Sequence, residues 1–405
     1  MHRIALALVI ALLLSSAPPG SARAYETRHV VIVVIDGGRF TETFGDTTFA
    51  NEPRQGLTMA PLGCRGSSWN MGVTTTVAGH AAILSGVYQP LLDDGTESPH
   101  LPLIYECYRA ATGAPRSEAW FFADKLKLGV MGSSDHPDYG DSLGASVDVT
   151  CPTDAAVIAS AESELLAGHP ALVALNLGWT DVIAHSGDWP GYLAALQTAD
   201  SLVYHLWQTV QSDTALAGRT TLFVTNDHGR HDDLHGGFQN HGDGCDGCRH
   251  VQLLALGPDF KTGFVSTAAM EPVDIATTVA ELLGFPLPYA TGHVMDDLLL
   301  VPHGTLDAGR DPVGPRLRFA APVPNPARGA VAFALDVPVA GVLTVDVLDT
   351  QGRSVATLER GATAAGRRPL TWSGRTSAGR RAAPGAYFVR ARMAGMQAAT
   401  RVVIR

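Results

Sequence analysis

The 405-residue sequence predicts an α/β unit with a mostly parallel sheet flanked by helices, followed by a small all-β sandwich. Over most of the chain, apolar runs typical of buried strands alternate with segments of helical spacing. Towards the C-terminus the pattern changes to short alternating strands separated by Gly and Pro turns. The charge changes there too. From Arg316 onward fourteen Arg accompany four acidic residues, a net of +10, which leaves −20 on the remainder because the whole chain carries −10. We therefore expect two domains.

The first 24 residues predict a secretory signal peptide. Arg3 is the short basic region, residues 4–14 are the apolar core, and Ala22-Arg23-Ala24 is a small-x-small cleavage site. This apolar core is too short to cross a bilayer as a helix, which needs about 20 residues, and no later segment is long and apolar enough. We expect an exported chain without a transmembrane segment, located in the periplasm, at the cell surface or outside the cell.

The first domain, which we place at residues 25–305, is predicted from its apolar patterns. The strands are expected at residues 30–35, 119–123, 171–177, 221–225 and 251–257. Helical spacing occurs in residues 81–87, 186–212 and 274–284. Strands that alternate with helices are typical of a parallel sheet with helices on both faces.

A Pro/Gly-rich linker, residues 306–319, is expected before the second domain, residues 320–405. Six strands are predicted there, at residues 331–335, 342–349, 354–358, 368–372, 386–393 and 400–405. Trp372 and Tyr387 are predicted core aromatics. The arginines are scattered between strands and do not cluster with aromatic residues, so we expect a solvated surface and no nucleic-acid polymer as partner.

Five cysteines occur in the sequence, and export would permit disulfides. Cys245 and Cys248 form a CDGC sequence. Such a sequence can be a redox motif or a small zinc site, but in an oxidising compartment a short disulfide that stiffens the loop is the favoured interpretation. The odd number leaves at least one cysteine free or intermolecular.

Asp and His residues follow three of the predicted strands. They are Asp36 after residues 30–35, Asp181 and His185 after residues 171–177, and Asp227, His228 and His241 after residues 221–225. Residues at the carboxyl ends of strands converge at one edge of an open α/β sheet, where ligands bind. Carboxylates and imidazoles together suit zinc or another borderline divalent metal. Two sets of three ligands, each with positions left open for substrate, are typical of a metal-dependent hydrolase.

In this order the motifs resemble those of the alkaline phosphatase superfamily, over roughly residues 28–300. The resemblance implies two metal sites, one formed by Asp181, His185 and His241 and the other by Asp36, Asp227 and His228. It selects His241 among the histidines of its loop, because this residue lies sixteen positions before the Gly-Pro that ends the next strand. By the same comparison His231 and His235 are solvated loop residues and His250 packs in the strand.

The resemblance also implies a nucleophile in TTTVAGHAAILSG, at the Thr four residues before a His that leads into a helix. That residue is Thr76, before His80, and Thr74 and Thr75 are neighbours without a predicted role. A hydroxyl at a helix N-terminus suits a phosphate, because backbone N–H groups there favour anions. The metal ion bound with Asp36 would lower the pKa of this hydroxyl. His80 is predicted to pack or to form hydrogen bonds and not to bind metal.

Basic residues at two places are predicted to bind substrate. Exported phosphatases of the superfamily carry Lys-x-Arg after a strand, and FFADKLKLG has Lys125 and Lys127 at a similar place. An ammonium group would neutralise outer phosphate oxygens without the bidentate geometry of Arg. An exposed charged turn is the alternative interpretation of this pair. Arg39, just after Asp36, is a further candidate contact.

The resemblance implies an exported hydrolase of phosphoric esters that uses two divalent ions, with zinc favoured, on a phosphorylated small molecule. We expect a phosphomonoesterase that forms a phospho-threonine intermediate, and a nucleotide pyrophosphatase/phosphodiesterase with the same seven site residues is the alternative. A sulfatase is disfavoured because the segment around Thr76 lacks the pattern C/S-x-P-x-R. A cytosolic phosphosugar mutase is disfavoured because those enzymes use Ser as nucleophile and lack an export signal. A surface protein with a structural metal site is disfavoured because such sites close their coordination with protein ligands.

The C-terminal segment resembles the Ig-like domain of flagellar hook-capping proteins and the sorting domains of type IX secretion. The resemblance rests on PNPARG, VLDTQGRSV, LTWSGRTSAGR and PGAYFVR. It implies attachment or sorting through secretion or cell-surface machinery, without catalytic residues.

Overall fold

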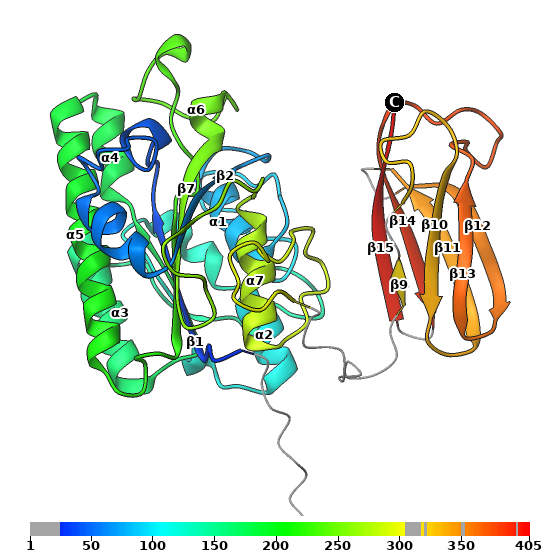
Figure 1. Ribbon diagram of the computed structural model, residues 1–405, viewed down its shortest axis with the longest axis horizontal. Helices are drawn as coiled ribbons and strands as arrows, with labels where there is room; N and C mark the ends of the chain where they lie inside the picture. Colours follow the sequence, from blue (N-terminus) through cyan, green and yellow to red (C-terminus); the bar gives the residue numbers. More distant parts are fainter. Residues whose placement is uncertain (1–24, 304–316, 320–321, 350–352, 394–395) are drawn as a thin grey trace, which may run out of the picture. The chain divides into compact units, whose positions relative to one another are not determined.

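The structure, a computed structural model, describes residues 25–303, 317–319, 322–349, 353–393 and 396–405. The chain divides into two compact units, Met1–Leu306 and Asp307–Arg405 (Figure 1). The predicted signal peptide lies outside the described residues, and so does most of the predicted linker.

An eight-stranded sheet forms the centre of the first unit, in the order β4-β3-β5-β1-β6-β7-β2-β8. Its strands are β1 (His29–Ile35), β2 (Cys64–Trp69), β3 (Ala119–Phe122), β4 (Ser146–Asp148), β5 (Leu172–Leu177), β6 (Thr220–Thr225), β7 (His250–Leu256) and β8 (Phe264–Val265). β7 is antiparallel to both β6 and β2, whereas the other neighbours pair in parallel. The predicted mostly parallel sheet is confirmed.

Helices cover both faces of this sheet (Figure 1). α1 (Thr76–Ser85), α2 (Ile104–Thr112) and α7 (Val273–Leu283) lie on one face, and α3 (Asp154–Gly168), α4 (Trp179–Ser186) and α5 (Trp189–Ser212) lie on the other. Alternate residues of β1 pack into the two cores: Val30, Ile32 and Val34 on the side of α1, and Val31, Val33 and Ile35 on the side of α5. Burial on both faces explains why this strand is a continuous apolar run.

Short helical segments lie in the connections of the first unit. They are α6 (Asp246–Arg249), η1 (Phe40–Glu42), η2 (Arg54–Met59), η3 (Ala60–Leu62), η4 (Arg116–Glu118), η5 (Leu126–Gly132), η6 (Asp141–Leu143) and η7 (Asp233–His235). No helix among the described residues combines the length and the apolar composition needed to cross a membrane.

The predicted strands of the first unit are present, each within one residue of its expected bounds. The three predicted helices correspond to α1, α5 and α7, although α1 begins at Thr76 and thus earlier than its apolar spacing indicates. The strand β2 was not predicted because its sequence, CRGSSW, is largely polar. It is partly exposed and is held by backbone pairing with β7 and β8.

The second unit consists of two antiparallel sheets, in the orders β13-β10-β9 and β12-β11-β14-β15. The strands are β9 (Arg318–Phe319), β10 (Val331–Val337), β11 (Gly341–Leu348), β12 (Ser354–Thr363), β13 (Gly366–Trp372), β14 (Gly385–Met393) and β15 (Met396–Ile404). The buried rings of Trp372 and Tyr387 meet edge to face with centroids 5.0 Å apart, which confirms both as core aromatics. The predicted Ig-like sandwich is confirmed.

The five cysteines are free, so the predicted disulfide between Cys245 and Cys248 is wrong. Cys245 is the N-cap of α6, and Cys248 lies within that helix. The Cys248 sulfur lies within 4.8 Å of ligand atoms of His231 and Asp243.

Candidate active site

Three strands deliver predicted metal ligands to one edge of the sheet. Asp36 follows β1 directly, and Asp227 and His228 follow β6. Asp181 and His185 lie on α4, which begins two residues after β5 ends. Because β1 pairs in parallel with both β5 and β6, these positions emerge side by side.

Asp36, Asp227 and His228 form the first candidate site. All three are fully buried, and their ligand atoms lie within 4.8 Å of one another. The His228 Nε2 atom is 3.6 Å from Asp36 Oδ1 and 3.5 Å from Asp227 Oδ2. These two carboxylate oxygens are buried without a hydrogen-bond partner. Since a buried oxygen without a donor costs free energy, the set fits a divalent cation that satisfies both.

Asp181, His185 and His241 form the second candidate site. His185 Nε2 lies 3.3 Å from Asp181 Oδ1, four residues before it on α4, and 3.2 Å from His241 Nε2. His241 Nε2 is 3.5 Å from Asp181 Oδ1. The other ring nitrogen of His241, Nδ1, is 3.0 Å from the Thr74 carbonyl oxygen. That oxygen can only accept, so Nδ1 carries the proton and Nε2 keeps a lone pair for metal. The rings of His228 and His241 stack at 3.8 Å, so the two sites adjoin.

Burial and neighbouring charges set the protonation states here. Burial, followed by the Asp227 carboxylate, raises the pKa of Asp36 to about 6. Burial, followed by His228, lowers the pKa of His241 to about 3, which keeps this imidazole neutral. Neutral imidazoles and ionised carboxylates are the forms that bind metal. A ligand set of only nitrogen and oxygen atoms fits zinc or a related borderline ion.

Lys125 lies between the two candidate sites. Its Nζ donates to Asp36 Oδ2 at 2.8 Å and to Asp181 Oδ2 at 2.6 Å. Burial alone would lower the pKa of this ammonium group, but Asp36 and Asp181 raise it above its ordinary value. Lys125 is therefore a buried cation that touches one carboxylate of each site.

Thr76 is the first residue of α1 and is fully buried. Its Oγ1 atom lies 3.5 Å from His228 Nε2, next to the first candidate site. α1 can approach this closely because residue 79 is Gly, where a Cβ atom would lie 2.5 Å from the Asp227 carbonyl oxygen. The structure thus brings the predicted nucleophile and the six predicted ligands to one edge of the sheet.

Arg230 is a residue of this region that the sequence patterns did not indicate. Its guanidinium is fully buried and donates from NH1 to Asp181 Oδ1 at 2.5 Å. It also donates from NH2 to the Gln239 carbonyl at 2.8 Å and from Nε to the Phe238 carbonyl. Arg230 therefore ties α4 to the loop that carries His241.

Two other residues have supporting places near the candidate sites. His80 Nδ1 lies 2.8 Å from the Thr76 carbonyl oxygen and 3.4 Å from Asp227 Oδ2, so this residue forms hydrogen-bonding contacts as predicted. Gly37 has a φ of +66°, and a Cβ atom there would lie 2.5 Å from Arg230 NH1. The turn after β1 therefore requires glycine, both for its conformation and for the approach of Arg230.

Lys127 and Arg39 contact other carboxylates. Lys127 Nζ pairs with Asp93 Oδ2 at 2.7 Å, and Asp93 Oδ1 accepts from the N–H of Val77 in the first turn of α1 at 2.8 Å. Lys127 thus contacts the start of α1 through Asp93.

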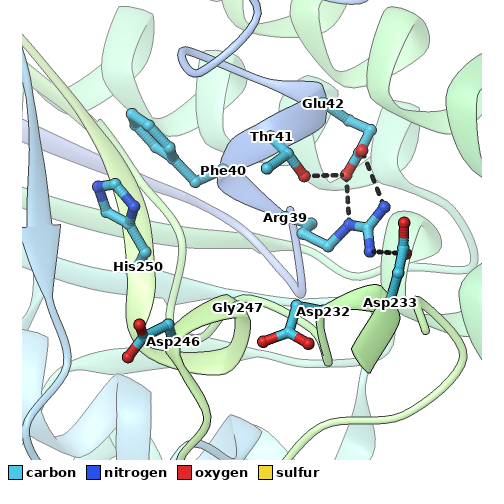
Figure 2. Close-up of a pocket in the computed structure, with 9 residues that line it drawn as sticks. All are labelled: Arg39, Phe40, Thr41, Glu42, Asp232, Asp233, Asp246, Gly247 and His250. Atoms are coloured by element: carbon cyan, nitrogen blue, oxygen red, sulfur yellow. Dashed lines mark hydrogen bonds and ion pairs between the residues drawn. The ribbon is translucent and has the colours of Figure 1, made fainter. Parts of the chain in front are cut away.

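Arg39 lines a pocket of about 300 Å³ that contains none of the six predicted ligands. Figure 2 shows its guanidinium bound to Glu42, at 2.5 Å, and to Asp233, at 2.9 Å. The pocket is lined by Arg39, Phe40, Thr41, Glu42, Asp232, Asp233, Asp246, Gly247 and His250. Four carboxylates against one guanidinium make this pocket unfavourable for an anionic phosphate.

Each unit contains a segment that matches the model of a known family. Residues 141–287 match the family model of the metalloenzyme superfamily, and residues 324–395 match that of the FlgD Ig-like domain. No curated protein matches the chain.

Solved structures with the same fold include murine ectonucleotide pyrophosphatase/phosphodiesterase 5, with 16% identity and a TM-score of 0.52 over 67% of this chain and 100% of that one. The human protein of the same name has 15% identity and a TM-score of 0.50, over 67% of this chain and 100% of that one. A protein of glycosaminoglycan metabolism from Bacteroides thetaiotaomicron gives 11% and 0.50, over 82% of this chain and 89% of that one. At these identities the similarity concerns the fold.

Proposed function

Because the first unit of this chain belongs to the metalloenzyme superfamily of alkaline phosphatase-like hydrolases, we propose that it hydrolyses phosphoric esters, with phosphate monoesters preferred. The reaction uses two divalent metal ions, of which zinc is favoured by the ligand set, and Thr76 as nucleophile. One observation carries the proposal: a buried hydroxyl at the start of α1 lies 3.5 Å from a ligand of the first candidate site, which adjoins the second.

In this proposal each candidate site holds one metal ion. Two such ions, when bound, lower the pKa of a hydroxyl nucleophile and stabilise charge on the attacking and leaving oxygens. Thr76 Oγ1 forms the bond to phosphorus while the ester oxygen departs in line, and water then hydrolyses the phospho-threonine. His80 holds the start of α1 and Asp227 in place, since it contacts both the Thr76 carbonyl and the Asp227 carboxylate.

Lys125 is the cation that we assign to the substrate. A phosphate monoester carries one more negative charge than a diester, and a buried ammonium group between the two sites can compensate it. All three cations pair with carboxylates, but those that hold Lys125 are the predicted metal ligands Asp36 and Asp181, and this position favours Lys125 as the phosphate contact.

The second candidate function is that of a nucleotide pyrophosphatase/phosphodiesterase. A threonine-to-alanine variant of the murine protein, solved with AMP, is described as inactive. A threonine at the predicted nucleophile position of this chain is consistent with either function.

The full-length chain should be assayed with an aryl phosphate monoester, a bis-aryl phosphate diester and an aryl sulfate. We expect the monoester to be hydrolysed fastest, extended chelation to abolish activity, and zinc to restore it. Thr76→Ala should lose nearly all turnover while it retains its metals, and Thr74→Ala and Thr75→Ala should stay active. Fewer than two metal ions in the active protein, or an active Thr76→Ala variant, would contradict the proposal.

Lys125→Ala and Lys127→Ala form a matched pair for the choice of substrate. Loss of a charged contact in a dry site costs about 2–4 kcal/mol. Lys125→Ala should therefore lower kcat/KM for the monoester far more than for the diester, whereas Lys127→Ala should change both by similar small factors. Equal losses for the two substrates in Lys125→Ala would place the phosphodiesterase function first.

Export and attachment are part of the same proposal. The signal-peptide pattern of the sequence supports secretion to the periplasm, the cell surface or the medium. The FlgD Ig-like unit supports contact with secretion or cell-surface machinery. Detection of the mature chain beginning near Tyr25 outside the cytoplasm would be the expected result.

A further inference from the structure

The connection between β6 and β7 contains Cys and His residues that the proposed reaction does not use. Within residues 231–248 two histidines have the spacing H-x3-H and two cysteines the spacing C-x2-C. Such pairs supply the four ligands of many structural zinc sites. We call these four residues the Cys/His cluster: His231, His235, Cys245 and Cys248.

The fold brings each thiol of the cluster close to one imidazole. Two groups of ligand atoms each lie within 4.8 Å: Cys248 with His231 and Asp243, and Cys245 with His235 and Asp232. The short turn of α6 joins the groups, because the Cys248 N–H donates to the Cys245 carbonyl at 3.0 Å. Both cysteines are free thiols.

The inner half of the cluster has an unsatisfied ligand atom. His231 Nε2 is buried without a hydrogen-bond partner, although Asp243 Oδ1 is only 3.3 Å away. The Cys248 side chain beside it is fully buried. A buried imidazole nitrogen without a partner costs free energy, and a cation bound next to Cys248 would remove that cost.

The two carboxylates are already engaged by the backbone of their turns. Asp243 Oδ1 accepts from the Cys245 N–H at 2.9 Å, and Asp232 Oδ1 accepts from the N–H groups of Leu234 and His235. Asp232 Oδ1 is also 2.7 Å from His235 Nδ1, a contact that orients the ring and leaves Nε2 for a metal. One oxygen of each carboxylate therefore shapes the loop, next to the Cys and His atoms that we take as the ligands.

A redox role for the cysteine pair is not favoured. Burial, followed by the neighbouring Cys245 thiol, raises the pKa of Cys248 to about 12. Redox-active cysteines need the opposite shift, because the thiolate is the reacting form. Zinc also binds the thiolate, but a bound ion supplies the positive charge that displaces the proton.

We propose that the Cys/His cluster binds one structural zinc ion, separate from the two candidate catalytic sites. His241, a ligand of the second candidate site, lies in the loop between His235 and Cys245. The ion would close this loop and hold His241 against Asp181, so the structural site would support the catalytic one. The inference does not depend on the proposed function.

Cobalt(II) distinguishes this site from the catalytic ones, because only a thiolate ligand gives a sulfur-to-metal charge-transfer band, and the candidate catalytic sites contain no thiol. The full-length chain, stripped by chelation and reloaded with cobalt(II), should show this band, and zinc should remove it. The zinc–sulfur distance measured by X-ray absorption should be about 2.3 Å.

Variants of the cluster should lose the band selectively. The double variant Cys245→Ser/Cys248→Ser should lack it and should bind one zinc ion fewer per chain than the wild type. Cys151→Ser, a matched control at a buried thiol elsewhere in the first unit, should keep both properties. His235→Ala removes the half-exposed ligand with little risk to the fold, and should weaken zinc binding at least about tenfold.

The competing disulfide is tested by titrating thiols in the unfolded chain. Five free thiols are expected, and three would overturn the proposal. A wild-type chain without the charge-transfer band, or a band that persists in the double serine variant, would overturn it as well. None of these outcomes depends on whether the chain hydrolyses phosphoric esters, so a failure here and a failure of the proposed function can be told apart.

Discussion

Replacement of Arg230 by Ala should strongly destabilise the first unit, even in the absence of metal. The Arg230 guanidinium is fully buried and donates to the carboxylate of Asp181 and to the carbonyl oxygens of Phe238 and Gln239. Without it, Asp181 keeps Lys125 as a cationic partner, but the two carbonyl groups lose their shared donor.

The expected magnitude follows from these contacts. Removal of the only partner of a buried charge costs about 3–5 kcal/mol, and Asp181, which keeps Lys125, should lose less than this. The hydrogen bonds to the Phe238 and Gln239 carbonyls are only partly buried, so water can replace much of the lost donor and their loss adds less than the cost of about 1–3 kcal/mol for a buried acceptor. We therefore expect a loss of about 3–5 kcal/mol in total, which is a large part of the total of about 5–15 kcal/mol for a typical domain.

Urea unfolding in the presence of chelator is the appropriate assay. The helices of the described residues all lie in the first unit, so the helical circular dichroism signal reports the unfolding of that unit. Arg249→Ala is a matched control, because Arg249 donates to the carbonyl oxygens of Gly244, at 2.6 Å, and Asn70, at 3.1 Å. The control should lose only about 1–3 kcal/mol. An Arg230→Ala variant as stable as the wild type, or as the control, would refute this reasoning.

Two further predictions concern stability. Burial raises the pKa of Glu52 to about 8. Above the ordinary pKa of a glutamate, the native state therefore retains a proton that the unfolded state has lost. The free energy of unfolding should fall as the pH rises from about 5 to 8, by up to about 1.4 kcal/mol per pH unit. The Glu52→Gln variant should show a weaker dependence of stability on pH. The assignment would be contradicted if the urea midpoint of this variant changed between about pH 5 and 8 as much as that of the wild type. Trp372→Ala should destabilise the second unit by about 3–5 kcal/mol, since this side chain is only 1% exposed. The unfolding midpoint measured by the helical signal and the rate of hydrolysis should stay unchanged. A parallel loss of hydrolysis would contradict this prediction.

The strands and most of the candidate site were predictable because their signals are local. The apolar runs predicted as strands between residues 30 and 257 are buried strands, and Asp36 and Asp227 lie within two residues of the ends of two of them. The strand β2 could not be predicted in this way, because its sequence is largely polar. Backbone pairing with β7 stabilises it, and such pairing leaves no pattern in the sequence.

Contacts between distant segments were not predictable from the sequence. Arg230 binds Asp181, which is 49 residues earlier in the chain, and nothing in the sequence around either residue indicates that the guanidinium turns inward. Lys125 was expected near the substrate, but its position between Asp36 and Asp181 depends on the order of β3, β5 and β1 in the sheet. The predicted Cys245–Cys248 disulfide is wrong, because the spacing of two cysteines in a sequence does not distinguish free thiols from a bonded pair.

In the proposed reaction Thr76, at the start of α1, is phosphorylated during the hydrolysis of phosphoric esters. The zinc-loaded chain should be mixed with a phosphate monoester, quenched in acid during turnover, digested and mapped by mass spectrometry. A peptide carrying one phosphoryl group on Thr76, absent after chelation and in Thr76→Ala, is the predicted result. Active turnover without a phosphorylated peptide, or with the phosphoryl group on Thr74 or Thr75, would contradict the account.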